Sequence, residues 1–113
     1  MNFTASQHGP VTVITLEGNI LGGPDGTILN SKLHELIDGG VQRVVLDLGG
    51  VAFMNSSGLG MLIGGVTTMR NAGGGLKVAN ASGKIAGLIT IAKLTSIVEL
   101  YPSIDAAVAS FDR

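Results

Sequence analysis

Cysteine and tryptophan are absent from this chain, and charged and aromatic residues are few. Among 113 residues, 13% are charged and 4% are aromatic, and the formal net charge is −1. Without cysteine there can be no disulfide, thiolate nucleophile or cysteine-based metal site, which fits a reducing compartment. The seven Lys and Arg residues are spread along the chain and form no basic cluster. This distribution argues against binding to the phosphates of a nucleic acid.

The sequence also lacks the pattern of a leader or of a membrane span. Its first residues contain no cationic run followed by an apolar stretch, so we expect no signal peptide and a cytoplasmic location. Residues 48–69 carry no charge, but Asn55, Ser56, Ser57 and several glycines interrupt the window. We therefore expect a buried strand and a partly buried helix there, with no insertion into a membrane.

Hydrophobic residues make up 45% of the chain, the usual share for a globular domain with one core. Their spacing predicts the element order β-β-α-β-α-β-α-β-α. The expected strands cover residues 3–7, 11–17, 43–48, 76–80 and 97–100. The expected helices start near Pro24, Ser57, Ser82 and Ser103, with the last two serines as caps. We assign residues 1–113 to one α/β domain with a mixed, mostly parallel sheet, an N-terminal hairpin and about four helices.

Residues 55–60, with the sequence NSSGLG, follow a predicted strand and begin the second predicted helix. The carboxyl ends of strands in an open α/β sheet are where ligands bind. A helix N-terminus adds unpaired N–H groups and a partial positive charge, which suit a phosphate on Ser56 or Ser57. Capping by Asn or Ser accounts for the same residues, so the residues alone leave both interpretations open.

The second predicted helix has an apolar face for the sheet and an opposite face without charge. The apolar face is formed by Leu59, Leu62, Ile63, Val66 and Met69. The uncharged face is formed by Ser57, Met61, Gly64 and Thr68, with Gly60 and Gly65 at its edges. Small residues and an exposed Met indicate a surface that another protein approaches closely.

Residues 53–60, FMNSSGLG, follow the strand VVLDL at residues 44–48 and resemble the signature of bacterial anti-sigma factor antagonists. These antagonists are single STAS domains, and the resemblance covers nearly the whole chain. It implies that the protein binds an anti-sigma factor, a histidine-kinase-like ATPase that phosphorylates serine, and so releases a sigma factor. Carried onto this chain, the family motif makes Ser56 the phosphoacceptor, with Ser57 as the helix cap and backup acceptor. It further implies a metal-dependent serine phosphatase that reverses the modification.

The chain departs from this family pattern at three positions. The usual Asp of the motif is Asn55, which keeps the hydrogen-bonding shape without the charge. Two positions that are often acidic after the second strand are Asn19 and Leu21, in a region that the resemblance assigns to contact with the kinase. The neutral residues favour an alternative: a STAS scaffold, or a subunit of a signalling or lipid-transport assembly, that is not phosphorylated.

Motifs for catalysis and cofactor binding are weak. Residues 58–63, GLGMLI, begin like a dinucleotide fingerprint but lack its third glycine, and no P-loop is present. His8 and His34 fall in the first turn and the first helix, so we expect neither a serine triad nor a metal site. Asp47 ends a strand and is expected to hydrogen-bond the following loop. The sequence therefore predicts a regulatory binding protein with no enzymatic activity, cofactor or metal.

Overall fold

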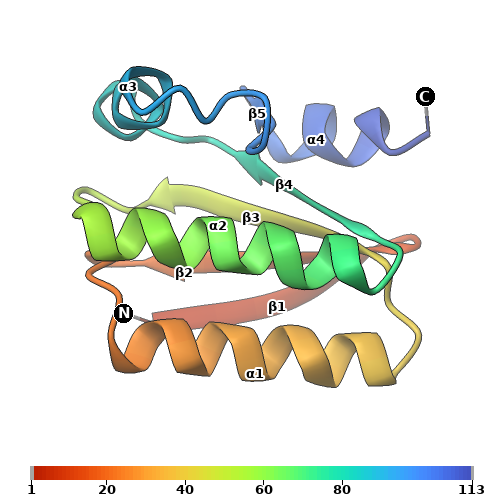
Figure 1. Cartoon of the computed structure of the whole chain (residues 1–113). Helices are drawn as coiled ribbons and strands as arrows, with labels where there is room; N and C mark the ends of the chain where they lie inside the picture. The colour runs from red at the N-terminus through yellow and green to blue at the C-terminus, as the bar shows by residue number, and fades with distance from the viewer. Residues whose placement is uncertain (1, 113) are drawn as a thin grey trace.

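The computed structural model describes residues 2–112, in which four helices and five strands alternate along the chain (Figure 1). The strands are β1 (Asn2–His8), β2 (Val11–Glu17), β3 (Arg43–Gly50), β4 (Gly75–Ala79) and β5 (Leu100–Tyr101). The helices are α1 (Pro24–Asp38), α2 (Ser56–Asn71), α3 (Gly83–Ile91) and α4 (Ile104–Ser110). The predicted α/β class, the N-terminal hairpin and the four helices are confirmed.

The five strands form one mixed sheet in the order β1-β2-β3-β4-β5. Strands β1 and β2 are antiparallel, and every later neighbour is parallel. Each parallel connection must cross the sheet through a helix, which explains the alternation of strands and helices. As a result, β2, β3 and β4 all end at the same edge of the sheet, called the carboxyl edge below.

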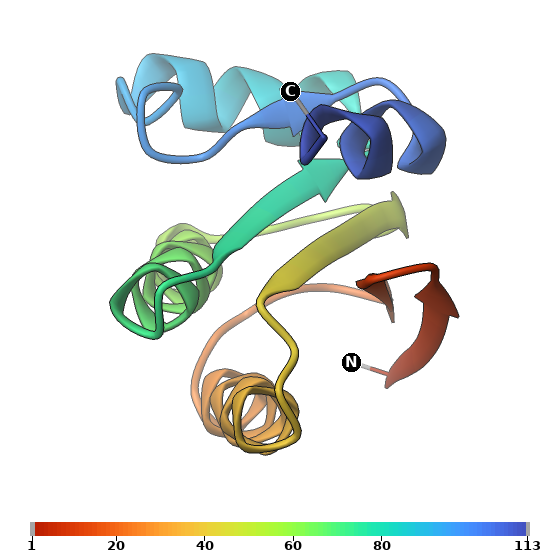
Figure 2. The same ribbon diagram turned by 90° about the vertical axis from the view of Figure 1, so that its right-hand side faces the viewer.

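Helices cover both faces of the sheet. Figure 2 shows α1 and α2 on one side and α4 on the other. The main core lies under α1 and α2, and α3 contributes Ile85 and Ile89 to it. A smaller cluster on the other face joins Val11, Val13 and Val45 to Ala107 of α4. Strand β2 is therefore buried on both sides, as the lack of a polar face in its sequence predicted.

Most predicted helix starts are confirmed, with Pro24 in the first turn of α1. Ser82 caps α3 by accepting a hydrogen bond from Ile85 N (3.4 Å), and Ser103 caps α4 by accepting one from Ala106 N (3.0 Å). Helix α2 begins at Ser56, one residue before the expected start. Within the part of the chain that the structure describes, no helix has the length and apolar character needed to span a bilayer.

The last strand differs most from its prediction, because β5 covers only Leu100–Tyr101 and not residues 97–100. The amides of Ile97 and Val98 both donate to the carbonyl oxygen of Leu94 and so form a turn. Val98 is nevertheless buried at 1% exposure. An apolar residue in a buried turn has the same sequence pattern as one in a short strand, which explains the error.

Candidate functional site

Two loops meet at the carboxyl edge, and backbone hydrogen bonds join them. Residues 18–23 follow β2, and residues 51–55 follow β3. Ile20 N donates to Phe53 O (2.9 Å), and Asn55 N donates to Ile20 O (3.3 Å). Ile20 and Met54 thus form an isolated parallel bridge beyond the ends of the two strands. This bridge holds Asn19 and Leu21 next to the start of α2.

Asn55 is the N-cap of α2. Its backbone is extended, with φ −97° and ψ −177°, and its side-chain Oδ1 accepts a hydrogen bond from Gly58 N at 2.8 Å. The prediction that Ser57 caps the helix is therefore wrong, because Ser57 lies inside the first turn. An Asp at this position would offer the same acceptor oxygen, so the cap requires only the shape that Asn and Asp share.

Two glycines allow the loop after β2 to touch the first turn of α2. A methyl group on Gly58 would overlap the carbonyl oxygen of Ile20. Gly22 has φ +78°, and a Cβ there would lie 2.7 Å from Cβ of Ser57. Gly60, in contrast, has open space around it. Gly58 is thus required by a close backbone contact, whereas Gly60 is not.

Ser56 and Ser57 are both exposed at the first turn of α2. Neither hydroxyl has a hydrogen-bond partner among residues 2–112. The first N–H groups of a helix lack intrahelical acceptors and carry partial positive charge. Asn55 satisfies the amide of Gly58, which leaves the preceding amides at the helix start to interact with an anion. The arrangement can stabilise a phosphate attached to either hydroxyl.

The predicted partner-binding residues divide into two groups. Asn19, Leu21 and Gly64 are exposed, and 48% of Leu21 is accessible to solvent. Met61 is only 8% exposed, so the expectation of an exposed Met is wrong. Thr68 is half-buried, and its hydroxyl donates to Asn30 Oδ1 of α1 at 2.7 Å. The role of these five residues in partner binding stays a prediction.

Packing between α1 and α2 explains the burial of Met61. Gly26 of α1 lies so close that a Cβ on it would be 3.5 Å from Cγ of Met61. The solvent-exposed side of α2 is therefore rotated from the predicted one, and it runs along Ser56, Gly60, Gly64 and Thr67. No charged residue lies on this side of the helix before Arg70.

Other polar residues at the carboxyl edge have structural roles. Asp47 Oδ1 accepts hydrogen bonds from Gly49 N and Asn80 Nδ2, each at 3.0 Å, as predicted for this residue.

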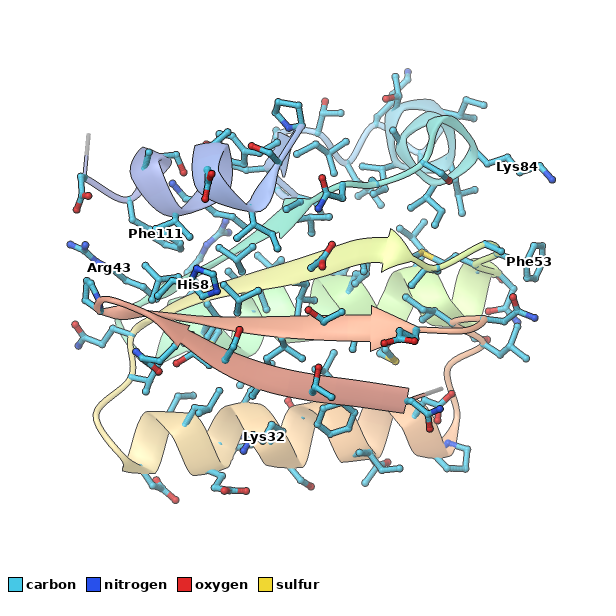
Figure 3. All side chains as sticks on the ribbon, turned by 180° about the vertical axis from the view of Figure 1, so that it is seen from behind. His8, Lys32, Arg43, Phe53, Lys84 and Phe111 are labelled. Carbon is cyan, nitrogen blue, oxygen red and sulfur yellow. The ribbon has the colours of Figure 1, made fainter. Side chains whose placement is uncertain are left out.

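The two histidines lie away from the carboxyl edge. His8 lies at the far end of the molecule from Phe53 (Figure 3), and His34 is exposed on α1. Among residues 2–112, no group of three His, Cys, Asp or Glu could hold a metal ion.

Sequence reasoning missed the groove beside the site. Phe53, 48% exposed, lines it together with Met54 and with Lys84, Ile85 and Leu88 of α3. The two halves of this groove are about 30 residues apart in the sequence, so no local motif marks it. The sequence signal that could have marked it is an aromatic residue, Phe53, in a predicted loop.

Comparisons with solved structures show the same fold in proteins of several kinds. A Thermotoga maritima protein assigned as an anti-sigma factor antagonist has a TM-score of 0.87 and 18% identity, covering 98% of this chain and 95% of its own. The Bacillus cell fate determinant SpoIIAA in its phosphorylated form has a TM-score of 0.72 and 18% identity, covering 97% and 99%. The murine anion transporter Slc26a9 matches with a TM-score of 0.76 and 19% identity, covering 95% of this chain and 18% of the transporter.

The family comparison is more specific than these likenesses of fold. The model of the STAS domain matches residues 2–107, from β1 into α4. The matched region includes the loop after β2, the Asn55 cap and the whole of α2, so the candidate site lies within it. On this match the chain belongs to the STAS domain family.

Proposed function

We propose that this protein is an anti-sigma factor antagonist whose binding to an anti-sigma factor serine kinase is switched by phosphorylation of Ser56. The observation that carries the proposal is the exposed hydroxyl of Ser56 at the first residue of α2, in the antagonist-like sequence NSSGLG. The fold shared with SpoIIAA in its phosphorylated form supports it. The role is regulatory, and the serine accepts a phosphate without acting as a catalytic nucleophile.

Steric contacts favour Ser56 over Ser57 as the phosphoacceptor. Cβ of Ser57 lies against the backbone turn at Gly22, where even a methyl group would approach it to 2.7 Å. The three atoms nearest to that Cβ position all belong to Ser57, and none belongs to Ser56. A kinase must bring the hydroxyl within reach of a nucleoside triphosphate, and the less crowded serine is the better substrate. Ser57 remains the backup acceptor.

The electrostatic surroundings explain how phosphorylation would oppose binding. Asn19 and Leu21 are neutral and exposed beside the first turn of α2, and the exposed side of α2 has no charge before Arg70. A phosphate adds about −1.5 to −2 charge at neutral pH. The helix N-terminus stabilises that charge in the free protein, whereas docking of an apolar partner surface would desolvate it. Phosphorylation therefore weakens the complex, and a metal-dependent serine phosphatase restores binding.

The phosphoacceptor is tested by incubating the protein with the cognate kinase and ATP and measuring the intact mass. The wild type and Ser57→Ala are expected to gain the mass of one phosphate, and Ser56→Ala is expected to gain none. An unchanged mass for the wild type, or an equal gain for Ser56→Ala, would overturn the assignment.

The switch is tested by the affinity for the unmodified kinase. Ser56→Asp is expected to weaken binding at least tenfold, whereas Ser57→Ala changes it less than about threefold. Leu21→Ser should also weaken binding if the loop after β2 contacts the kinase. Equal affinities for the wild type and Ser56→Asp would contradict an electrostatic switch.

A second function is favoured by the neutral Asn55 and Leu21. With these residues, the domain would serve as an unphosphorylated subunit of a signalling or lipid-transport assembly. The occurrence of the fold within an anion transporter supports this alternative. Co-purification distinguishes the two functions, because a transporter ATPase would favour the subunit and a histidine-kinase-like ATPase would favour the antagonist.

A further inference from the structure

An apolar groove opens at the carboxyl edge between the loop before α2 and the first turns of α3. Its volume is about 170 Å³, and it is lined by Ala52, Phe53, Met54, Lys84, Ile85 and Leu88. Lys84 is the only charged residue in this lining. Figure 3 shows Phe53 and Lys84 projecting from the same edge of the molecule, on the loop and on α3 respectively.

The size of the groove restricts what it can hold. Sites for cofactors and drug-sized ligands usually enclose about 300–1,000 Å³. A groove of 170 Å³ is too small for such a ligand, but it can receive one large apolar side chain. Ile91 lies one turn beyond Leu88 on α3 and is 83% exposed, so apolar surface continues outside the groove. Exposed apolar surface of this kind marks sites of protein interaction.

The chain segment that carries the groove and α3 has charge of one sign. From residue 48 to residue 98 the chain contains no Asp or Glu, although it contains four cationic residues. Lys84 lies in the first turn of α3 and Lys93 just after its end. Both are exposed, and neither forms an ion pair within residues 2–112. Such a surface attracts acidic partners and repels basic ones.

We propose that this groove docks an acidic segment of a partner protein, which inserts one large apolar side chain between Phe53 and Leu88. Lys84 pairs with a carboxylate of the segment, and Ile91 extends the apolar contact along α3. The site uses neither Ser56 nor the first turn of α2. It therefore goes beyond the proposed function and does not depend on phosphorylation.

The probe for this site is a synthetic peptide, acetyl-EEDFDEE-amide, titrated into the full chain labelled with ¹⁵N. We expect saturable shifts of the amides of Phe53, Ile85 and Leu88, with a Kd near or below about 1 mM. Two control peptides replace either the central Phe by Ala or all the acidic residues by Lys, and both should cause no saturable shift. Absence of saturable shifts with the Phe peptide, or shifts confined to other elements, would overturn the proposal.

Charge-reversal variants test the role of Lys84. Lys84→Glu is expected to lower the affinity for the peptide about tenfold, because an attractive charge pair becomes a repulsive one. The matched control is Lys32→Glu on α1, which should change the affinity less than about twofold. Ser56→Ala should bind like the wild type, so failure of the phosphorylation proposal leaves this result intact. Equal losses in Lys84→Glu and Lys32→Glu would contradict a specific site.

An anionic lipid surface has a charge similar to that of the peptide and serves as the competing ligand. Vesicles of phosphatidylglycerol and phosphatidylcholine are mixed with the protein and sedimented. We expect that any co-sedimentation of the wild type is unchanged in Lys84→Glu. If vesicles bind the wild type through Lys84 while the Phe peptide does not bind, the acidic-segment proposal is overturned in favour of a membrane surface.

Discussion

The carboxyl edge and the α4 face of the sheet are stabilised in different ways. At the carboxyl edge, backbone meets backbone: Ile20 bonds to Phe53 and Asn55, and the glycine at position 58 lets the Ile20 carbonyl approach α2. On the α4 face, long side chains make the contacts. Lys77 Nζ donates to Ser110 Oγ at 2.8 Å and lies 4.3 Å from the centroid of the Phe111 ring.

This difference determines which substitutions each region tolerates. A contact between backbones fails when a side chain is added, whereas a contact between side chains fails when one is shortened or loses its charge. Ser56 and Leu21, two exposed residues of the candidate site, take no part in the backbone hydrogen bonds between the two loops. The carboxyl edge can therefore present variable side chains on a rigid frame. Two matched pairs of substitutions test this contrast, and variants of Asn80 and Asn55 sharpen it.

Gly58→Ala is expected to have the largest effect, a loss of about 3 kcal/mol in the free energy of unfolding. The added methyl group would overlap the carbonyl oxygen of Ile20, so the loop after β2 must move away from α2. Urea denaturation measures the loss. The amide of Asn55 donates to the carbonyl oxygen of Ile20. Loss of its protection from hydrogen exchange would show that the destabilisation arises at this contact.

The matched control is Gly60→Ala, two residues along the same helix. Nothing lies within 4 Å of a Cβ at this position, so the change should stabilise the protein by roughly 0.5–1 kcal/mol through helix propensity. Similar destabilisation by both substitutions would show that the backbone contact at Gly58 is not what distinguishes this edge.

Lys77→Met tests the α4 face and is expected to cost about 2 kcal/mol. Met keeps much of the apolar stem but removes the hydrogen bond to Ser110 and the cation over Phe111. The side chain of Lys77 is 12% exposed, so water cannot replace these contacts fully. Faster hydrogen exchange in α4, measured by NMR, should accompany the loss of stability.

Lys32→Met is the control for this change, because Lys32 forms an i,i+3 ion pair with Glu35 at 3.5 Å on the surface of α1. Surface pairs of this kind contribute little, and the expected change is below about 0.5 kcal/mol. If Lys77→Met were equally mild, the contacts of Lys77 would contribute little to holding α4 on the sheet.

The sequence predicted most of the fold because the helices and strands follow local rules. Hydrophobic periodicity identified β2, β3 and α2, and the caps at Ser82 and Ser103 were visible as single residues. Errors arose where tertiary contacts decide. Three adjacent residues, Asn55, Ser56 and Ser57, can each cap a helix, and the bridge to Ile20 determines which one does so.

The candidate site was harder to predict than the fold. The exposed side of α2 depends on how α1 packs beside it. No pattern in the sequence predicts that Gly26 of α1 lies against Met61 of α2. The groove between Phe53 and Leu88 joins segments from two different crossovers of the sheet. Such sites require the packed structure, because periodicity within one element cannot position a neighbouring element.

At the carboxyl edge, Asn80→Ala is expected to lower the free energy of unfolding by about 1.5 kcal/mol. Asn80 has φ +59°, a left-handed conformation that disfavours Ala, and its side chain donates to Asp47 Oδ1 at 3.0 Å. Asn80→Gly loses the same hydrogen bond, but glycine adopts the left-handed backbone conformation without strain. We therefore expect a loss of about 0.5 kcal/mol in the free energy of unfolding. Thermal unfolding of both variants separates the two contributions, and a Gly variant as unstable as the Ala variant would assign the whole effect to the hydrogen bond.

Substitution of Asn55 is expected to affect stability less than Asn80→Ala does, and this residue connects the frame to the switch. Asn55→Ala should cost about 1 kcal/mol, because Gly58 N loses its acceptor. Asn55→Asp keeps an acceptor and places a negative charge at the N-terminus of α2, so stability should stay within about 0.5 kcal/mol of the wild type. Urea denaturation at neutral pH compares the variants, and an Asp variant as unstable as the Ala variant would contradict the shared cap geometry. Because capping accepts either residue, any difference between Asn and Asp in the rate of Ser56 phosphorylation must come from the charge that the kinase meets, and not from a change in the helix start.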